Sequence, residues 1–433
     1  MARSKAPALR PDTDAKPGAY FLSLTVENVR CFGPAQTLDL SDGHGHHAPW
    51  TIILGENGLG KTTLLTCLAL IAGTHHAFSG GRHTWELIGT RNRLVRSGRK
   101  KGIADAIVVS AGKSQKRGKI KVALPSGTTT ASADGILQSL RSYHYGASRR
   151  MPQRMGLVAD DDRIGIFLDD DVTLRDPEDW LLTADYNARL HGPEARRFDA
   201  FAQRVRNALV KFLPEVDDVR IQAAEEPTGS PFVEARTLDG WVPLRQLGFG
   251  YQSQIAWLVD LASRMFERYP DSPDPLTEPA VAIIDEIDLH MHPRWQRRIV
   301  HDLTMLFPNT QFIVTSHSPL MVQAAGDANF ALLRRERDHV LIENHPEVLR
   351  NWRVDQILTS ELFGLKSARP PQIEGPLKER REILAKPKLT KADEKRLAEL
   401  EQAIGDLPAG ETAEDSRAME LIRRAAAKLS SNA

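Results

Sequence analysis

A glycine-rich segment between two apolar stretches constrains this chain more than any other feature. Residues 50–55, WTIILG, favour a short buried strand, and residues 61–73, KTTLLTCLALIAG, favour an apolar helix. The intervening GENGLGKT at 55–62 matches the pattern G-x-x-x-x-G-K-[ST]. In that pattern, backbone N–H groups and the helix N-terminus surround phosphate groups. The order strand, loop, helix therefore predicts an α/β P-loop fold with a nucleoside triphosphate site.

Each residue type in this loop has a chemical reason to be there. The glycines let the backbone curl around phosphate oxygens, Lys61 places an ammonium against the β- and γ-phosphates, and the Thr62 hydroxyl is a ligand for Mg²⁺. The residues expected to bind the nucleotide here are Gly55, Glu56, Asn57, Gly58, Leu59, Gly60, Lys61, Thr62 and Thr63.

A second apolar run ends in acids, as a P-loop site requires. The segment AVAIIDEID at 280–288 favours a buried strand followed by Asp285 and Glu286. Because successive strand side chains point to opposite faces, the two carboxylates can take different roles. We expect Asp285 to reach the metal and Glu286 to polarise the attacking water. Two adjacent acids favour magnesium-dependent hydrolysis over binding alone.

The same segment continues as LHMHPRW and raises a second possibility. His290 and His292, beside three acids, resemble the ligands of a metal hydrolase. A zinc site needs a third ligand from the protein, and none follows at ligand-like spacing. The nucleotide interpretation is therefore favoured.

Composition indicates an ordinary soluble globular protein of two or three domains. Of the 433 residues 26% are charged and 41% hydrophobic, and the net charge is +1. Two cysteines, Cys31 and Cys67, are too few for a disulfide framework, which favours the cytoplasm. No apolar run is long enough to span a membrane, and residues 1–19 are expected to be a disordered tail.

Two charged stretches remain open to more than one interpretation. Residues 82–121 hold twelve Lys or Arg against Glu86 and Asp105. They indicate either a solvated lobe or a nucleic-acid surface. Residues 160–179 hold nine Asp or Glu, including two Asp triplets. A solvated acidic loop is favoured there over a nuclease site.

Patterning predicts several further elements. Residues 21–40 favour two strands around the turn-like CFGPA, and Asp239-Gly240 favours a hairpin. A C-terminal helix is expected to be capped by Thr390. Apolar residues recur at helical spacing at Phe198, Phe201, Val205, Leu209 and Phe212.

Four phrases occur in the order found in one group of ATPases. GENGLGKTTLL, LRQLGFGYQS, IIDEIDLHMHPRW and FIVTSHSPLMV make residues 20–330 resemble the ABC-type ATPase heads of the RecF, SMC and OLD group. The resemblance implies a head at 20–330 with an inserted basic lobe and helical region at about 79–215. It leaves residues 331–433 as a helical C-terminal region.

The resemblance also assigns roles to residues outside the phosphate loop. Asp288 takes the D-loop position, and His317 is the switch histidine that senses the γ-phosphate. LGFGYQ stands at the signature motif, with Gly248 in place of the usual Ser and with Gly250 close to the phosphate of another copy. YHYGASRR at 143–150 occupies the Q-loop region. ATP and Mg²⁺ are the implied cofactors.

A narrower resemblance indicates a biological role. EIDLHMHPRWQ, FPNTQFIVTSHSP, YGASR and DQILTSELFGL are similar to stand-alone bacterial AAA-family ATPases such as the Septu anti-phage ATPase. This implies a homodimer or higher oligomer that sandwiches ATP and gates a separate nuclease effector. The alternatives are a RecF-like repair ATPase that binds DNA and, less favoured, a self-sufficient nuclease.

Overall fold

The computed structural model describes residues 18–73, 93–111, 115–126, 128–132, 136, 139–152, 174–223, 230–346, 352–360, 362–365, 367, 370–386 and 390–404. The expected tail up to residue 17, both Asp triplets, and the end of the chain from 405 lie outside the described residues. The chain divides into two compact units, Met1–Ile357 and Leu358–Ala433.

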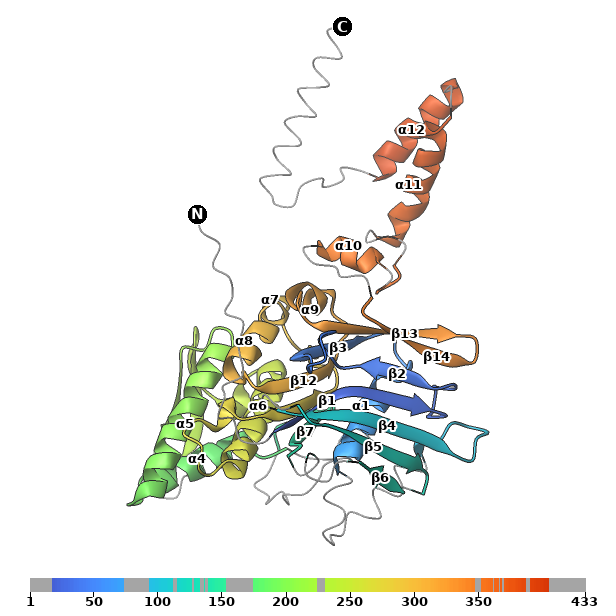
Figure 1. The fold of residues 1–433 in the computed structure, drawn as a ribbon. Helices are drawn as coiled ribbons and strands as arrows, with labels where there is room; N and C mark the ends of the chain where they lie inside the picture. The colour runs from blue at the N-terminus through green and yellow to red at the C-terminus, as the bar shows by residue number, and fades with distance from the viewer. Residues whose placement is uncertain are drawn as a thin grey trace, which may run out of the picture. The chain divides into compact units, whose positions relative to one another are not determined.

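A six-stranded sheet carries the functional motifs of the first unit (Figure 1), in the strand order β14-β13-β3-β12-β11-β7. The strands are β3 (Trp50–Leu54), β7 (Ser142–Tyr145), β11 (Ala280–Ile284), β12 (Thr310–Thr315), β13 (Asn329–Glu336) and β14 (His339–Asn344). All pairs are parallel except that of β14 with β13. β3, β11 and β12 are buried along their whole length, which explains their continuous apolar sequences.

A second, antiparallel sheet has the strand order β2-β1-β4-β5-β6. Its strands are β1 (Ala19–Glu27), β2 (Gln36–Asp39), β4 (Gly102–Ser110), β5 (Arg117–Leu124) and β6 (Thr129–Ala131). The predicted strand pair around CFGPA is confirmed as β1 and β2. Helix α1 (Lys61–Gly73) contacts strands of both sheets, and every residue in it except Thr62 is buried. A helix enclosed on all sides must be apolar all round, as this sequence is.

The basic stretch does not form an inserted lobe where the structure describes it. Residues 102–124 supply β4, which pairs with β1 in the antiparallel sheet, and β5, which pairs with β4. Residues 142–145 supply β7 of the parallel sheet. The prediction for about 79–215 combined a basic lobe with a helical region, and its basic-lobe part is wrong for these strands. The basic residues of β5 alternate along its solvent-exposed face. The pairing of β4 with β1 is a long-range contact, which composition does not reveal.

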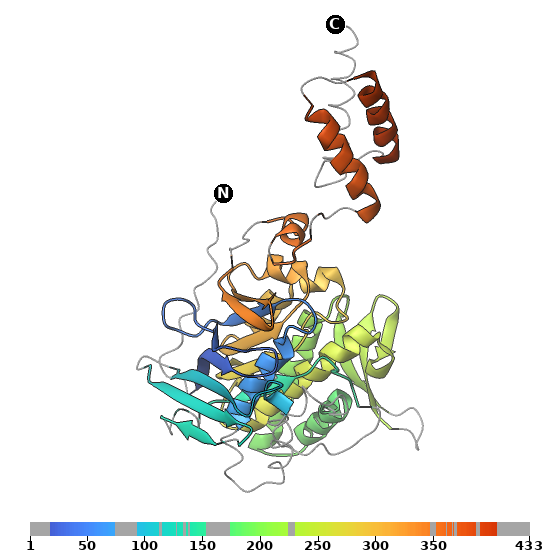
Figure 2. The same cartoon turned by 90° about the vertical axis from the view of Figure 1, so that its right-hand side faces the viewer.

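A helical layer lies together on one side of the first unit (Figures 1 and 2). It consists of α4 (Pro177–Ala188), α5 (Pro193–Phe212) and α6 (Phe249–Arg268), which contact one another. Phe201, Val205, Leu209 and Phe212 of α5 are buried, which confirms the predicted amphipathic helix. A small antiparallel sheet joins this layer: β8 (Asp218–Gln222), β9 (Phe232–Thr237) and β10 (Gly240–Pro243). β9 and β10 form the hairpin predicted at Asp239-Gly240.

The short elements are 3₁₀ turns at Leu244–Gln246 and Pro275–Thr277, and helices α7 (Pro293–Gln296), α8 (Ile299–Leu306), α9 (Pro319–Ala324) and α10 (Val354–Thr359). The prediction of a helical region from residue 331 is wrong at its start. Residues 329–344 form β13 and β14, and β13 pairs with β3 at the centre of the main sheet. No described helix is long and apolar enough to cross a membrane.

The second unit contains a helical hairpin of α11 (Pro371–Leu384) and α12 (Lys391–Ile404). Ile383, Leu400 and Ile404 form its buried cluster. Thr390 caps α12 as predicted, because its Oγ1 accepts from the N–H of Asp393 at 3.2 Å. The Asp393 carboxylate accepts in return from the N–H of Thr390 at 3.0 Å, so the cap is reciprocal.

Candidate nucleotide site

The glycine loop leaves β3 and ends where Lys61 begins α1, as the sequence predicts. Gly55, Gly58 and Gly60 have φ angles of +148°, +78° and +92°, which favour glycine. Gly60 has a second constraint, because a Cβ there would lie 2.4 Å from the Cys31 sulfur. The turn before β2 therefore supports the phosphate loop from outside.

Lys61 folds back over this loop. Its Nζ donates to the carbonyl oxygens of Gly55 at 2.8 Å and Glu56 at 3.1 Å. Burial lowers the pKa of the ammonium, and the negative charges of Asp285, Glu286 and Asp288 oppose that shift. A cation thus stands at the mouth of a loop of N–H groups, as a phosphate site requires.

Two hydroxyl groups join the phosphate loop and the end of β12 to the acidic residue Asp285. Thr62 Oγ1 donates to Asp285 Oδ2 at 2.6 Å, across 223 positions of sequence. Thr315 Oγ1, at the end of β12, donates to the other oxygen of Asp285 at 2.5 Å. A hydroxyl beside a carboxylate is the donor set that Mg²⁺ takes in P-loop proteins, so Thr62 and Asp285 fit a magnesium ion.

Glu286 has an unusual backbone conformation, with φ of +46°. Its N–H donates to Thr315 Oγ1 at 2.7 Å, and its carbonyl oxygen accepts from Arg149 at 2.8 Å. Both contacts come from residues that the sequence did not single out. Arg149 lies in the YHYGASRR segment beyond β7, which was assigned only as a region, and Thr315 is concealed within an apolar strand.

Asp288 follows on the same turn, and one of its carboxylate oxygens is buried without a hydrogen-bond partner among the described residues. A buried acceptor in that state indicates a missing donor.

The two histidines of LHMHP have separate structural roles. The ring of His290 meets Phe249 edge-on, with centroids 4.7 Å apart. His292 caps α7, because its Nδ1 accepts from the N–H of Arg294 at 3.3 Å. The structure therefore assigns these side chains to packing and helix capping.

His317 leaves the end of β12 and is exposed. Partial burial of its ring and then the nearby Lys61 ammonium lower its pKa, although Glu286, Asp288 and Asp285 oppose the shift. The imidazole is therefore neutral near neutral pH. The next residue, Ser318, caps α9, with Pro319 in the first turn. Pro319 thus begins a helix beyond the histidine.

The signature segment forms the start of α6, with Gly248 as its N-cap. Gly250 packs within the same chain, since a Cβ there would lie 2.4 Å from the carbonyl oxygen of His290. Gly248 is exposed, and a Cβ there would meet nothing closer than a Tyr251 ring carbon at 3.9 Å. The requirement for glycine at 250 is therefore at least partly a packing requirement.

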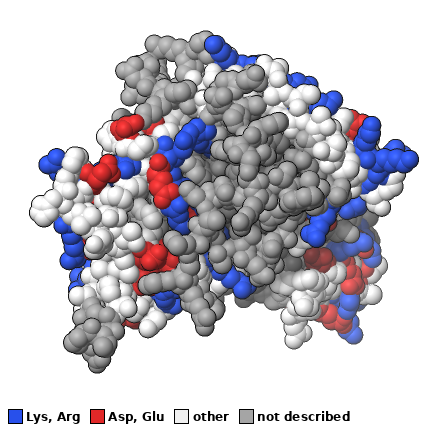
Figure 3. Space-filling model, turned by 90° about the horizontal axis from the view of Figure 1, so that it is seen from below, with Lys and Arg blue, Asp and Glu red and all other residues white. Residues whose placement is uncertain are grey.

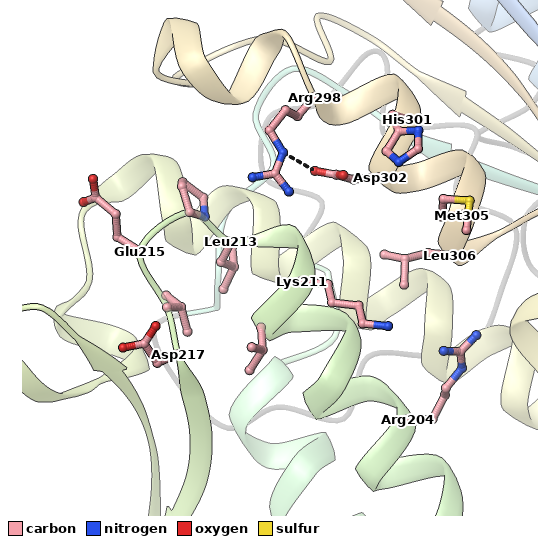
Figure 4. A pocket seen from close by; sticks show the side chains of 13 residues that line it. Arg204, Lys211, Leu213, Glu215, Asp217, Arg298, His301, Asp302, Met305 and Leu306 are labelled. Carbon is pink, nitrogen blue, oxygen red and sulfur yellow. Dashed lines mark ion pairs between the residues drawn. The ribbon is translucent and has the colours of Figure 1, made fainter. Parts of the chain in front are cut away.

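A separate cavity of about 490 Å³ lies between α5, the loop after it and α8 (Figure 4). The ion pair of Arg298 with Asp302, 3.5 Å apart, spans its α8 wall. None of the predicted site residues lines it. Tyr251 of α6 donates to the carbonyl oxygen of Pro214 at 3.0 Å, so the cavity wall is tied to the signature helix.

Comparisons with known proteins agree with this geometry. A family model described as "AAA domain" matches residues 23–133, and one described as "AAA domain, putative AbiEii toxin, Type IV TA system" matches residues 143–322. The chain is 27% identical over 344 residues to the Septu protein PtuA of Bacillus mycoides (strain KBAB4), covering 77% of this chain and 43% of that protein. The chain thus has an α/β P-loop fold and is similar in sequence to PtuA.

The chain is also 30% identical over 168 residues to the Retron Ec83 probable ATPase of Escherichia coli, covering 39% of this chain and 29% of that protein. The chain thus spans less than half the length of either relative. Among solved structures, an SMC head bound to the C-winged helix domain of ScpA aligns with a TM-score of 0.46 and 17% identity, covering 76% of this chain and 98% of that one.

Proposed function

We propose that this ABC-type head binds ATP with Mg²⁺ and hydrolyses it. The observation that carries the proposal is the convergence of Thr62, Asp285 and Thr315, which joins the phosphate loop to the acidic strand. The bound metal would neutralise phosphate charge, with Thr62 and Asp285 to hold it. Glu286 would orient the water that attacks the γ-phosphorus as the bond to the bridging oxygen breaks.

Two substitutions test this assignment for different reasons. Lys61→Ala removes the cation from the phosphates, so the affinity for ATP should fall. Glu286→Gln keeps the shape but loses the carboxylate, so ATP should bind normally while kcat falls by about 100-fold or more. Equilibrium binding of a fluorescent ATP analogue and phosphate release measure the two effects. If Glu286→Gln hydrolyses ATP at the wild-type rate, the assigned role is wrong.

The head is proposed to work as a dimer that sandwiches ATP. The exposed Gly248 at the N-cap of α6 supports this, because it is accessible to a contact from a second copy. In a two-fold arrangement each signature segment completes the site of the other copy. ATP would favour the closed dimer and hydrolysis would release it.

The proposed biological role is an anti-phage switch that gates a separate nuclease effector. Similarity to Septu PtuA and to a retron ATPase supports it. Co-expression with the products of the neighbouring genes, followed by phage challenge of wild-type and Glu286→Gln strains, tests the role. Equal protection by both strains would show that the defence role does not require ATP hydrolysis.

A second candidate is a RecF-like ATPase that binds DNA. The exposed face of β5 favours it, because Arg117, Lys119 and Lys121 alternate along one side of the strand. Lys119 is partly engaged by Asp105 at 2.9 Å. Figure 3 shows Lys and Arg gathered mostly along the upper right margin of the described surface, with both signs of charge mixed elsewhere. Steep salt dependence of duplex binding would support this candidate.

A further inference from the structure

Arg149 is a fully enclosed cation next to the acidic strand. Its side chain ranks among the largest completely buried ones, at 2% exposure. One terminal nitrogen donates to the carbonyl oxygens of Asp285 at 2.5 Å and Gly146 at 3.2 Å. The other donates to the carbonyl oxygen of Glu286 at 2.8 Å. The guanidinium therefore clamps the main chain of both acids.

Burying the charged guanidinium of Arg149 costs desolvation free energy. Burial lowers the pKa of Arg149 to about 10, against the opposing effect of Asp285, Asp288 and Glu286. The group is still charged at neutral pH. Apolar side chains of similar volume often fill a buried site at least as stably as a buried charge. A buried guanidinium whose donors reach three carbonyl oxygens instead fixes those carbonyls in place.

Two of the carbonyls that it fixes, those of Asp285 and Glu286, lie on either side of a strained φ angle. A left-handed backbone is unfavourable for a residue with a Cβ and persists only where surrounding contacts hold it. At Glu286 the φ angle is +46°. Thr315 accepts from its N–H and Arg149 donates to its carbonyl oxygen, so the residue is held on both sides. The direction of the Glu286 side chain depends on this conformation.

The segment that carries Arg149 is itself anchored at both ends. At the near end, the N–H of Asp285 donates to the carbonyl oxygen of Tyr145 at 2.8 Å. At the far end, the carbonyl oxygen of Pro152 accepts from Arg245 at 2.8 Å. Arg245 also pairs with Asp176 and Glu178. The segment that carries Arg149 is thus bonded to Asp285 at one end and, at the other end, to Arg245, which lies just before the signature segment.

We propose that Arg149 is a positioning residue that holds Glu286 in the orientation needed for ATP hydrolysis. The inference rests on the proposed hydrolytic role of Glu286 and adds a residue to it. Arg149 acts through the backbone of Glu286 and has no expected contact with the nucleotide. Its removal should therefore impair the chemical step and leave nucleotide binding intact.

The test compares Arg149→Met and Arg149→Lys with the wild type. For Arg149→Met we expect kcat to fall at least about tenfold while KM and the Kd for an ATP analogue stay within about twofold. Arg149→Lys keeps the charge but loses the fork of donors, and should recover part of kcat. It also remains informative if the Met variant does not fold.

Arg197→Met is the matched control for stability. Arg197 also donates to a main-chain carbonyl, that of Phe266, and its Nε is buried without a partner among the described residues. It belongs to the helical layer, so its loss should lower the unfolding midpoint without changing kcat. If kcat falls equally in the Arg197 and Arg149 variants, or if Arg149→Met hydrolyses at the wild-type rate, the inference is overturned.

A structural readout separates this inference from the proposed function. Crystal structures of the wild type and of Arg149→Lys report the φ angle of Glu286 whether or not ATP is hydrolysed. We expect φ to leave the left-handed region, or the Glu286 side chain to lose its single orientation, in the variant. An unchanged Glu286 overturns the positioning role. An inactive wild-type protein with a displaced Glu286 in the variant overturns only the proposed ATPase function.

Discussion

Thr315 illustrates how much a single hydroxyl contributes at the residue scale. It is the last residue of β12 and completely buried. Its hydroxyl donates to Asp285 and accepts from the N–H of Glu286, so it satisfies one group on each of the two acids. An apolar residue of the same shape would leave both groups without a partner in the interior, a cost of about 1–3 kcal/mol for each.

His317 is the residue for which the expected role can be tested most directly. Its ring is exposed and neutral near neutral pH, so it can offer an N–H to a phosphate. Loss of one such donor commonly lowers a rate by about 100-fold. We expect His317→Ala to lower kcat for ATP to that extent, measured by phosphate release, with the unfolding midpoint nearly unchanged.

His301→Ala is the control for that substitution, because His301 is also exposed but lies on α8 beside the separate cavity. It should hydrolyse ATP normally. A His317→Ala protein that unfolds at a much lower temperature would indicate a structural role for the ring and contradict the assignment.

At the scale of elements, the signature helix α6 and the segment after Asp288 form one packed unit. Gly250 allows the first turn of α6 to lie against the carbonyl of His290, and Phe249 meets the His290 ring. The aromatic cluster continues below, where Tyr251 and Phe212 pack on Trp295. The signature and the D-loop position of one chain are therefore expected to move together.

Two glycines of this element should respond differently to substitution. Gly250→Ala introduces a clash with a backbone oxygen, so we expect a lower unfolding midpoint and reduced hydrolysis even without added charge. Gly248→Glu fits sterically, since its φ is −56°, and should leave the midpoint unchanged. In the proposed ATP-sandwiched dimer its charge would face the nucleotide of the other copy, so it should abolish dimer formation with a non-hydrolysable ATP analogue.

Sedimentation velocity measures that association, and Gly248→Ser is the matched control. Serine is a favourable N-cap and restores the hydroxyl usual in the signature motif, so this variant should dimerise. If Gly248→Glu dimerises and hydrolyses ATP as the wild type does, the sandwich arrangement does not apply to this protein.

At the scale of the whole molecule, the buried His144 and the half-buried His47 make the fold sensitive to acid. Burial lowers the pKa of His47 to about 4 and that of His144 to about 3. In the unfolded chain both titrate near 6.5. Between about pH 6.5 and pH 4 the unfolded state therefore binds more protons than the folded state, and stability falls as pH falls.

We expect the midpoint of thermal unfolding to drop between pH 7 and pH 5, by an amount equivalent to about 1–2 kcal/mol for each histidine. His144→Gln should reduce this dependence, because a neutral amide can still bond to Ser142, which lies 3.1 Å from the His144 ring nitrogen. The exposed His301→Gln is the control and should leave the dependence unchanged. Equal pH dependence in His144→Gln and the wild type would show that His144 is not responsible.

The sequence by itself determined the local features of this protein. A run of apolar residues, a glycine loop and an apolar helix form one continuous stretch, so β3, the phosphate loop and α1 could be predicted from neighbours in the chain. The same holds for the acidic strand, the amphipathic α5 and the cap at Thr390. In each case the sequence pattern and the element that it predicts lie in the same short stretch of the chain.

Only the tertiary structure decided which distant segments meet. The pairing of β13 with β3, the joining of β4 to β1, and the approach of Arg149 and Thr315 to Glu286 connect residues that are far apart in sequence. Isolated polar residues such as Arg149 and Thr315 do not produce a periodic hydrophobic pattern. At Glu286 both Arg149 and Thr315 bond to main-chain groups, which every residue carries, so a single sequence contains no signal that identifies these contacts.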